Sequence, residues 1–393
     1  MPFSQRTGWN TEESDLARAY GMRRLAGLPI ADLTASNPTR CELSYPSDLL
    51  GALVDPRALD YDPHPNGLEI ARQAVSSYYA EHEIGLDPGQ LLLTTSTSEA
   101  YSFLFRLLCD PGNEVLIPQP SYPLFDFLAQ LDDVQLKAAP MIYENGWQID
   151  PVGVRRAISS QTRAIVIVHP NNPTGHFTKP WEADALASLC REFKLSLIVD
   201  EVFLDYGIGA EGKSFASGLE DVQVFVVSGL SKIAGLPQMK VAWIAVTGPE
   251  RVRALARLEI IADTFLSMNA PVQWALPAWI RKRAFIQRQI RDRVARNLAR
   301  LDERLSVVPA IQRLALEGGW YAVLRIPAVQ PDEKTVLALL ERGAWLHPGY
   351  FFGMPVSGWL VVSLLAPELE FSNGVDILID YFRTDQKSNT KVY

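Results

Sequence analysis

Two lysines, Lys232 and Lys240, lie in the stretch VVSGLSKIAGLPQMKVAWIAV (226–246), where most other residues are small or apolar. An unpaired ammonium group is costly to bury, so lysines normally remain in water. Burial disfavours the charged form of lysine, and the neutral amine is a nucleophile. The stretch therefore predicts covalent chemistry by a lysine. The alternative, a lysine that extends its ammonium group to the surface, is weaker because both flanks have the composition of protein interior.

Three further polar groups follow runs that are typical of buried strands. Residues 96–98 (Ser-Thr-Ser) precede a helical pattern, and their hydroxyl and N–H groups suit an anion such as phosphate. Asn171 and Asn172 lie in PNNPTGH, and Asp200 ends LSLIVD, where a buried carboxylate needs a cation or an N–H partner. Each has an ordinary alternative: residues 96–98 and Asp200 could each cap a helix, and the two asparagines could form a turn. Together they match one cofactor, pyridoxal phosphate, which needs a lysine for its aldehyde, an acid for its ring nitrogen, a phosphate seat and a donor to its ring oxygen.

The elements that must position these residues follow an alternating pattern. Short apolar runs separated by helical patterns predict a mostly parallel sheet with helices on both faces. The expected strands are residues 90–95, 114–118, 163–169, 195–200, 222–228 and 241–246. Beyond about residue 286, a long basic amphipathic helix (roughly 287–307) leads to shorter strands and a closing helix, which predicts a smaller α+β domain. We therefore expect an α/β fold with a large domain at 46–286 and a small domain made of 1–45 and 287–393.

The order of the motifs resembles the class I/II aminotransferases, a fold-type-I family of pyridoxal-phosphate enzymes. The resemblance runs from about residue 30 to 380. It is carried by YDPHPNGLEIARQAV, LTTSTSEA, PGNEVLIPQPSYP, HPNNPTG, DEVF, SGLSK and HPGYFFG. It implies a large domain with a mostly parallel seven-stranded sheet, a smaller α+β domain and a homodimer.

The resemblance also implies a role for each matching residue. Lys232 would form a Schiff base with the cofactor and move the proton between the substrate's α-carbon and the cofactor. Asp200 would pair with the protonated pyridine nitrogen, Asn172 would donate to the ring oxygen, and Tyr122 would stack on the ring. The phosphate would be held by Ser96, Thr97, Ser231, Lys240 and, from the neighbouring subunit, Tyr61.

Three departures from the family pattern concern the cofactor. Lys240 replaces an arginine and cannot form its two parallel hydrogen bonds, although its charge would help to keep Lys232 neutral. Gly229 stands where a phosphate-binding serine is common. Phe203 replaces a tyrosine that donates to the ring oxygen, and Tyr206 is a candidate replacement for that donor.

The fourth departure concerns the substrate. Val361, in GWLVVSLLAPE, stands where the family has an arginine that binds the substrate's α-carboxylate. Either another arginine does this work or the substrate has no carboxylate there. Arg40, together with Asn172, is the candidate for substrate binding, and the alternative for Arg40 is a surface residue. We expect an unusual amino donor and poor activity with common α-amino acids.

Three functions remain open at this level. The first is an aminotransferase acting on a small amino donor and a keto acid, and the second is a pyridoxal-phosphate lyase or cyclase of the same fold. The third is a non-catalytic effector-binding domain, which is disfavoured because no basic recognition helix precedes the resemblance.

Bulk composition excludes several partners. The chain has 393 residues, 48% hydrophobic, with a net charge of −8, so no general positive field would attract nucleic acid or an anionic membrane. No run is long enough to span a membrane, and the N-terminus is polar rather than signal-like, which predicts a cytoplasmic protein. Three cysteines and five histidines show no metal-ligand spacing, so no metal site is expected.

Overall fold

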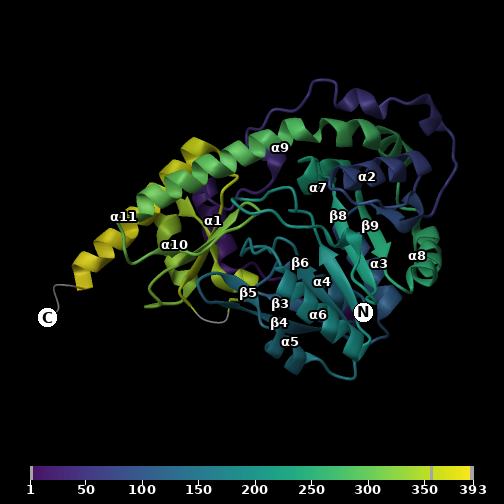
Figure 1. Ribbon diagram of the computed structural model, residues 1–393. Coiled ribbons are helices and arrows are strands. Elements are labelled where there is room, and N and C mark those ends of the chain that lie inside the picture. The colour runs from purple at the N-terminus through teal and green to yellow at the C-terminus, as the bar shows by residue number, and fades with distance from the viewer. Residues whose placement is uncertain (1–2, 355–356, 390–393) are drawn as a thin grey trace.

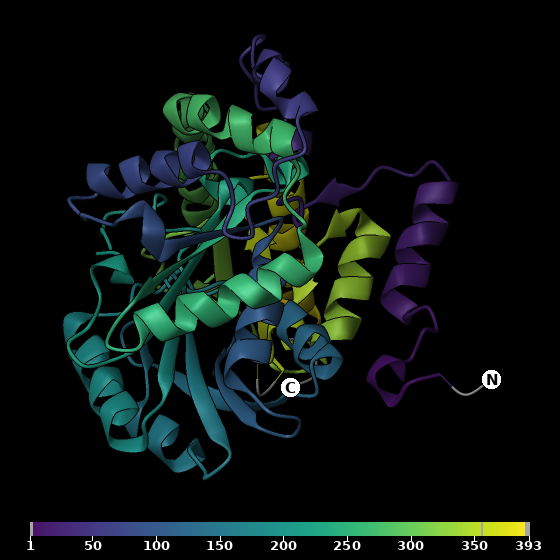
Figure 2. The ribbon, with the colours of Figure 1, turned by 90° about the vertical axis from the view of Figure 1, so that its right-hand side faces the viewer.

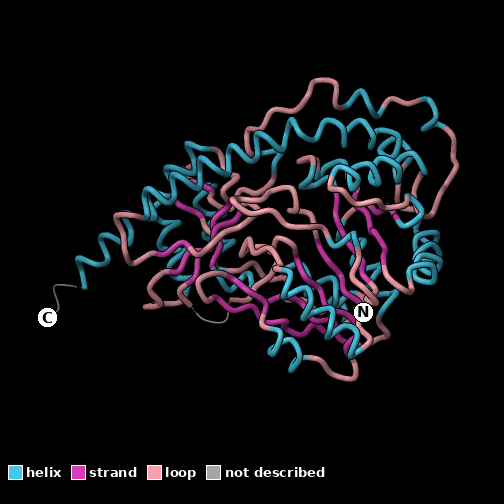
Figure 3. The backbone as a smooth tube through the Cα atoms, viewed as in Figure 1, coloured by secondary structure: helices cyan, strands magenta, loops and turns pink. Residues whose placement is uncertain are grey.

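The computed structural model describes residues 3–354 and 357–389. Strands gather into two main sheets, as Figure 3 shows in magenta. The larger sheet has eight strands in the order β2-β9-β8-β7-β6-β3-β4-β5, and only β9 and β5 run against the others. Its strands are β2 (Leu91–Thr94), β3 (Glu114–Gln119), β4 (Gln135–Tyr143), β5 (Trp147–Ile149), β6 (Thr162–Val168), β7 (Ser196–Asp200), β8 (Val224–Gly229) and β9 (Ala242–Thr247).

The central strands are buried on both faces because helices cover each side. Along β8, Val224 and Val226 belong to one apolar cluster, while Phe225 and Val227 belong to the other. Successive side chains of a strand point to opposite faces, so this alternation marks two separate cores. The helices of the first core are α2 (Glu69–Glu81), α5 (Pro151–Ala157), α6 (Pro180–Phe193) and the start of α9 (Ala270–Leu305), and those of the second are α3 (Thr97–Leu108), α4 (Leu124–Leu131) and α8 (Arg251–Phe265).

The smaller part combines the N-terminal and C-terminal segments of the chain. Its antiparallel sheet has the order β10-β11-β14-β13, and β1 pairs in parallel with β12 beside it. Figure 2 shows α1 beside α10, far from the large sheet. The elements are α1 (Asp15–Leu25), β1 (Ala31–Asp32), β10 (Gln312–Arg313), β11 (Tyr321–Arg325), α10 (Asp332–Arg342), β12 (Ala344–Trp345), β13 (His347–Pro348), β14 (Trp359–Ser363) and α11 (Glu368–Asn389).

Short helices complete the connections between these elements. The four-residue α7 (Leu230–Ile233) carries Lys232 directly after β8. The 3₁₀ helices are η1 (Gln5–Thr7), η2 (Pro38–Arg40), η3 (Leu50–Leu53), η4 (Pro56–Leu59), η5 (Pro88–Gln90), η6 (Phe215–Ser217), η7 (Pro237–Met239) and η8 (Gly349–Phe352).

The α/β fold predicted from the sequence, with a mostly parallel large sheet and a smaller α+β part, is confirmed. The resemblance implied seven strands and the sequence marked six by their residue ranges, whereas the sheet has eight, because β4 and β5 join the six and pair antiparallel with each other at the sheet edge. No strand was expected at β4 because Lys137 and Pro140 interrupt its apolar pattern. β5 pairs only with residues 141–143 of β4, so Lys137 and Pro140 lie in the part of β4 that pairs with β3 alone and leaves its other side without a ladder.

Helix α9 runs across both parts of the molecule without a break (Figure 1). Its first turns, around Trp279, pack on the large-sheet core, and its last turns, around Leu301, pack on the small-sheet core. The helix expected at about 287–307 therefore begins earlier, at Ala270. The expected domain boundary at residue 286 falls inside α9.

No helix in the described ranges is both long and apolar enough to cross a membrane. The same residues contain no group of three or more His, Cys, Asp or Glu side chains arranged to hold a metal ion.

Candidate active site

A cavity of about 530 Å³ opens above the carboxyl ends of β6, β7 and β8, between the two sheets. Parallel strands bring their carboxyl ends to one edge, where ligands of open α/β sheets collect. Residues from distant parts of the sequence meet there. The predicted site residues that line the cavity are Ser96, Thr97, Tyr122, Asn172, Asp200, Ser231, Lys232 and Lys240.

Lys232 extends into this cavity from a short helix whose backbone is held from three sides. The hydroxyl of Tyr206 donates to the carbonyl oxygen of Lys232 (2.6 Å), and the Gln287 amide donates to that of Ile233 (2.9 Å). The hydroxyl of Tyr45 donates to the carbonyl of Gly235 (2.7 Å). A single helical turn is not stable by itself, so these side chains fix the lysine's position.

The amine of Lys232 is surrounded by apolar groups. Its Nζ lies 5.1 Å from the centre of the Trp320 ring and 5.6 Å from that of Phe203. Burial lowers the pKa of Lys232 to about 8, and the charge of Asp200 acts in the opposite direction. At a pKa of about 8, about a tenth of this amine is neutral at pH 7, far more than for an exposed lysine, and the neutral form is a nucleophile. Burial is the main cause of the lowered pKa of Lys232. The charge of Lys240, which the sequence suggested as a contributor, is not among its causes.

Asp200 ends β7 and is only 8% exposed. Burial raises its pKa to about 6, while hydrogen bonds from the Val202 N–H and the Tyr101 hydroxyl, and the charge of Lys232, lower it. The Tyr101 hydroxyl donates to Oδ2 (3.1 Å) and the Val202 N–H to Oδ1 (3.1 Å). An acid held in this way can pair with a cationic ring nitrogen facing the cavity.

The start of α3 supplies the anion seat. Ser96 is the N-cap, and its side chain accepts from the Glu99 N–H (3.2 Å), so the capping interpretation holds for this hydroxyl. Thr97, Ser231 and Lys240 line the same cavity. A helix N-terminus with hydroxyls and a nearby ammonium group can bind a phosphate dianion.

The two asparagines of PNNPTGH have different surroundings. Asn171 is turned into the loop, where its amide donates to Thr174 Oγ1 (2.9 Å) and the Pro120 carbonyl (3.2 Å). The buried Oδ1 atoms of both asparagines have no hydrogen-bond partner, but Asn172 lines the cavity and Asn171 does not. Only the second asparagine is therefore available to a ligand.

Two predicted site residues lie outside this cavity. Tyr61 is 84% exposed and lines a separate surface pocket, so its contribution to a neighbouring subunit stays a prediction. Arg40 ends η2, is exposed, and is not among the residues that line the cavity, so its role in substrate binding also stays a prediction.

The departures from the family pattern have local explanations. A Cβ atom at Gly229 would lie 2.9 Å from the Val241 carbonyl oxygen, so the neighbouring strand leaves no room for a serine. The hydroxyl of Tyr206 donates to the Lys232 carbonyl oxygen, and Tyr206 does not line the cavity. It is therefore not the replacement donor to the cofactor's ring oxygen. Val361 is fully buried and pairs in register with His347 on the small sheet.

Several residues of the cavity were not selected from the sequence. Tyr101 lies on α3 among apolar neighbours, a pattern that indicates core packing. A second group reaches the cavity from the small part of the molecule, and three of its members lie in the HPGYFFG motif, to which the sequence assigned no role. They are Thr34, Ser36, Tyr321, His347, Phe351 and Phe352.

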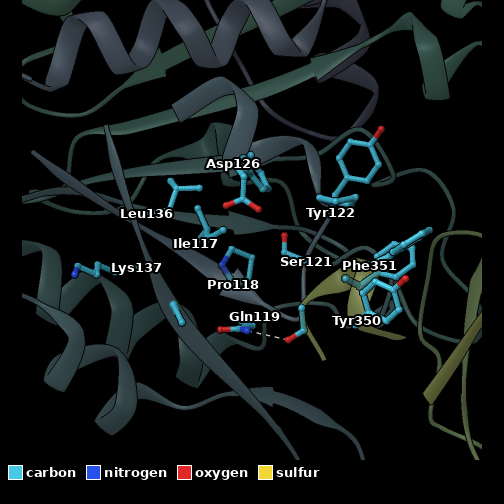
Figure 4. A pocket seen from close by; sticks show the side chains of 15 residues that line it. Ile117, Pro118, Gln119, Ser121, Tyr122, Asp126, Leu136, Lys137, Tyr350 and Phe351 are labelled. Carbon is cyan, nitrogen blue, oxygen red and sulfur yellow. Dashed lines mark hydrogen bonds between the residues drawn. The ribbon is translucent and has the colours of Figure 1, made fainter. Parts of the chain in front are cut away.

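A second pocket of about 250 Å³ adjoins this cavity and shares part of its wall, including Tyr122, Phe351 and Phe352. Figure 4 shows Tyr122 and Phe351 on one side of it, with Asp126 and Ser121 nearby. Aromatic side chains therefore stand between the cavity and this outer pocket.

Comparison with known proteins identifies the family. The family model described as "Aminotransferase class I and II" matches residues 56–370. The aspartate/prephenate aminotransferase of Thermus thermophilus is 28% identical over 349 residues, which is 86% of this chain and 87% of that protein. The S-alkyl-thiohydroximate lyase of Arabidopsis thaliana is 28% identical over 225 residues, covering 55% of this chain and 48% of that one.

Among solved structures, the alanine aminotransferase from Pyrococcus furiosus has the same fold, with a TM-score of 0.89 at 23% identity. It covers 98% of this chain and 100% of its own. The family match spans most of the sequence and contains the lysine, the aspartate and the asparagine of the cavity. The chain therefore belongs to the class I and II aminotransferase family.

Proposed function

We propose that this aminotransferase uses pyridoxal phosphate covalently attached to Lys232 to transfer an amino group between an atypical amino donor and a keto acid. The observation that carries the proposal is the pairing of Lys232 and Asp200 in one cavity, with a lysine pKa of about 8. A nucleophilic amine and a carboxylate facing the same space are what this cofactor requires.

The residues present fit the cofactor. Asn172 lines the cavity, where its side-chain NH₂ group can donate to the ring oxygen. Asp200 would pair with the ring nitrogen, and Tyr122 would stack on the ring. Thr97 and Lys240, with Ser96 and Ser231, would hold the phosphate. When bound, the cofactor supplies an electron sink for negative charge at the substrate's α-carbon.

The chain's own task is to handle protons and to orient groups. Lys232, once free, would take the proton from the substrate's α-carbon, because its depressed pKa leaves part of the amine neutral. Asp200 would keep the ring nitrogen protonated. Tyr61 would complete the phosphate site of a second subunit in a homodimer.

The donor is proposed to be atypical because position 361 carries an apolar valine. A carboxylate is strongly held in a buried site by the two parallel hydrogen bonds of a guanidinium group, which valine cannot supply. Glutamate, aspartate and alanine should therefore be poor donors.

Two measurements test this function. Borohydride reduction followed by peptide mapping should add the cofactor's mass to Lys232, and a tag on another lysine would overturn the assignment. Absorbance changes after mixing the holoenzyme with a panel of amines would test the donor. Rapid conversion by glutamate, aspartate or alanine would refute the atypical donor.

A lyase or cyclase of the same fold is the second candidate, and the similarity to a protein named as a lyase favours keeping it. The same Lys232 and Asp200 would serve it, because the cofactor's chemistry is shared. Release of ammonia and a keto acid without an acceptor would favour elimination, and a requirement for a keto-acid acceptor would favour transfer.

A further inference from the structure

The small-sheet side of the cavity presents uncharged polar groups. Among the described residues that line the cavity, the cations are Lys232 and Lys240, the carboxylate is Asp200, and none is an arginine. The polar groups contributed by the small part of the molecule are Thr34, Ser36, Tyr321 and His347.

His347 is a half-buried imidazole on the cavity wall with a ring nitrogen that makes no hydrogen bond. Its ring lies 5.9 Å from that of Phe351 and 5.6 Å from that of Phe352, and its buried Nδ1 has no partner. Burial lowers the pKa of His347 to about 4, so the ring is neutral near pH 7. A neutral imidazole offers one donor and one acceptor.

Among the described residues no cation acts on His347, and the one charged group that does is the carboxylate of Asp32, whose effect on the pKa is smaller than that of burial. Val361 lies opposite His347 in the antiparallel register, so both side chains share one face of the sheet, and Val361 is fully buried. Burial raises the pKa of Tyr321 to about 12, against a smaller opposite effect of its hydrogen bond with Ser36. The hydroxyl of Tyr321 is therefore neutral as well.

We call Thr34, Ser36, Tyr321 and His347 the small-sheet wall of the cavity. This wall discriminates between substituents on the amino donor. A carboxylate beside the reacting amine would lose its hydration against neutral groups, which is costly without a cation. Lys232 is committed to the cofactor, and Lys240, which is exposed at the end of η7, is assigned to the cofactor's phosphate. A hydroxyl or carboxamide carries no charge to desolvate and can both donate and accept.

We propose that His347 determines substrate specificity by hydrogen-bonding an uncharged polar substituent, a carboxamide or hydroxymethyl group, on the carbon that carries the reacting amine. This inference rests on the proposed aminotransferase function and names its donor class.

The first experiment compares donors that differ only at this substituent. Single-turnover reactions of the holoenzyme with alaninamide, 2-aminopropan-1-ol and alanine give kcat/KM for each. Alaninamide should exceed alanine by on the order of thirtyfold, the range expected when a desolvated polar group lacks its partner. Equal reactivity, or faster reaction with alanine, would overturn the inference.

Variants assign the effect to His347. His347→Phe keeps an aromatic ring but removes both nitrogens, so the preference for alaninamide should fall roughly tenfold. His347→Gln restores a donor and an acceptor and should recover part of it. The exposed Arg251 on α8, which does not line the cavity, provides the control, because Arg251→Ala should leave the ratio between the two donors unchanged. If Arg40→Ala, rather than His347→Phe, abolishes the preference for alaninamide, recognition belongs to Arg40 and the inference is overturned.

A binding measurement separates the two proposals. Calorimetry with propionamide and propionate measures the affinity of the small-sheet wall for each group without any reaction, because neither compound carries an amine. Propionamide should bind more tightly to the holoenzyme, and His347→Phe should lose that difference. If propionate binds more tightly, the inference fails while the aminotransferase function stands. If Lys232 carries no cofactor, the proposed function fails first.

Discussion

Replacing the acid of the site should stabilise the protein when it lacks its cofactor. Burial raises the pKa of Asp200 from 3.8 to about 6. A carboxyl whose folded pKa exceeds its unfolded value imposes no penalty below pH 3.8 and its full penalty above about pH 6. The shift of about 2 pKa units corresponds to about 3 kcal/mol at neutral pH. Asp200→Asn removes this penalty, because its amide has no charge to desolvate.

The expected shift in melting temperature follows from the chain length. Unfolding entropies of roughly 2.1 cal/mol/K per residue give about 0.8 kcal/mol/K for 393 residues, so a gain of about 3 kcal/mol raises Tm by about 4 °C. Near pH 5 the penalty is about half as large, and the gain should fall to about 2 °C. Thermal melts of cofactor-free protein at both pH values measure the two gains.

The exposed Asp184 on α6 is the matched control, and Asp184→Asn should leave Tm nearly unchanged at both pH values. The reasoning is refuted if Asp200→Asn lowers Tm near pH 7.5, or if its effect is the same at both pH values. The same variant should bind the cofactor poorly, since its ring nitrogen would lose its acid partner.

The remaining expectations concern the lysine and its supports. In cofactor-free protein, labelling of Lys232 by an amine-reactive reagent should rise with pH and reach half its maximum near pH 8, as quantified by mass spectrometry; a midpoint near 10.5 would contradict the effect of burial. Tyr206→Phe leaves the Lys232 carbonyl without its donor, so thermal melts should show a loss of about 1–3 kcal/mol; unchanged stability would mean that the bond does not hold α7. Gly229→Ser forces a Cβ atom against the Val241 carbonyl and should cost about 1–3 kcal/mol without improving phosphate binding. Tighter binding of pyridoxal phosphate with unchanged Tm would refute this steric account.

The part of the site carried by the large sheet could be predicted because each motif lies directly after a strand. Parallel strands bring their carboxyl ends together, so Asn172, Asp200 and Lys232 had to meet once the sheet was predicted. Local sequence also revealed the helix N-terminus at Ser96.

The small-sheet wall could not be predicted in this way. Ser36, Tyr321 and His347 come from short elements whose positions depend on packing between distant segments. Tyr101 was missed for a different reason: its place among apolar residues on α3 suggests core packing, while its hydroxyl reaches Asp200. Helix α9 was only partly predicted because its apolar face changes core along its length.

The lysine side of the cavity and its small-sheet side differ in how well they tolerate substitution. Lys232 depends on three hydrogen bonds to the backbone around α7, from Tyr206, Gln287 and Tyr45, so changes near the lysine disturb the catalytic geometry directly. His347 makes no hydrogen bond through Nδ1 and packs against aromatic rings of its own segment. Substitution there removes a recognition group without breaking a bond that positions the lysine. Substrate choice in this fold can therefore change on the small-sheet wall while the lysine and its acid remain in place, which is the division that the donor comparison tests.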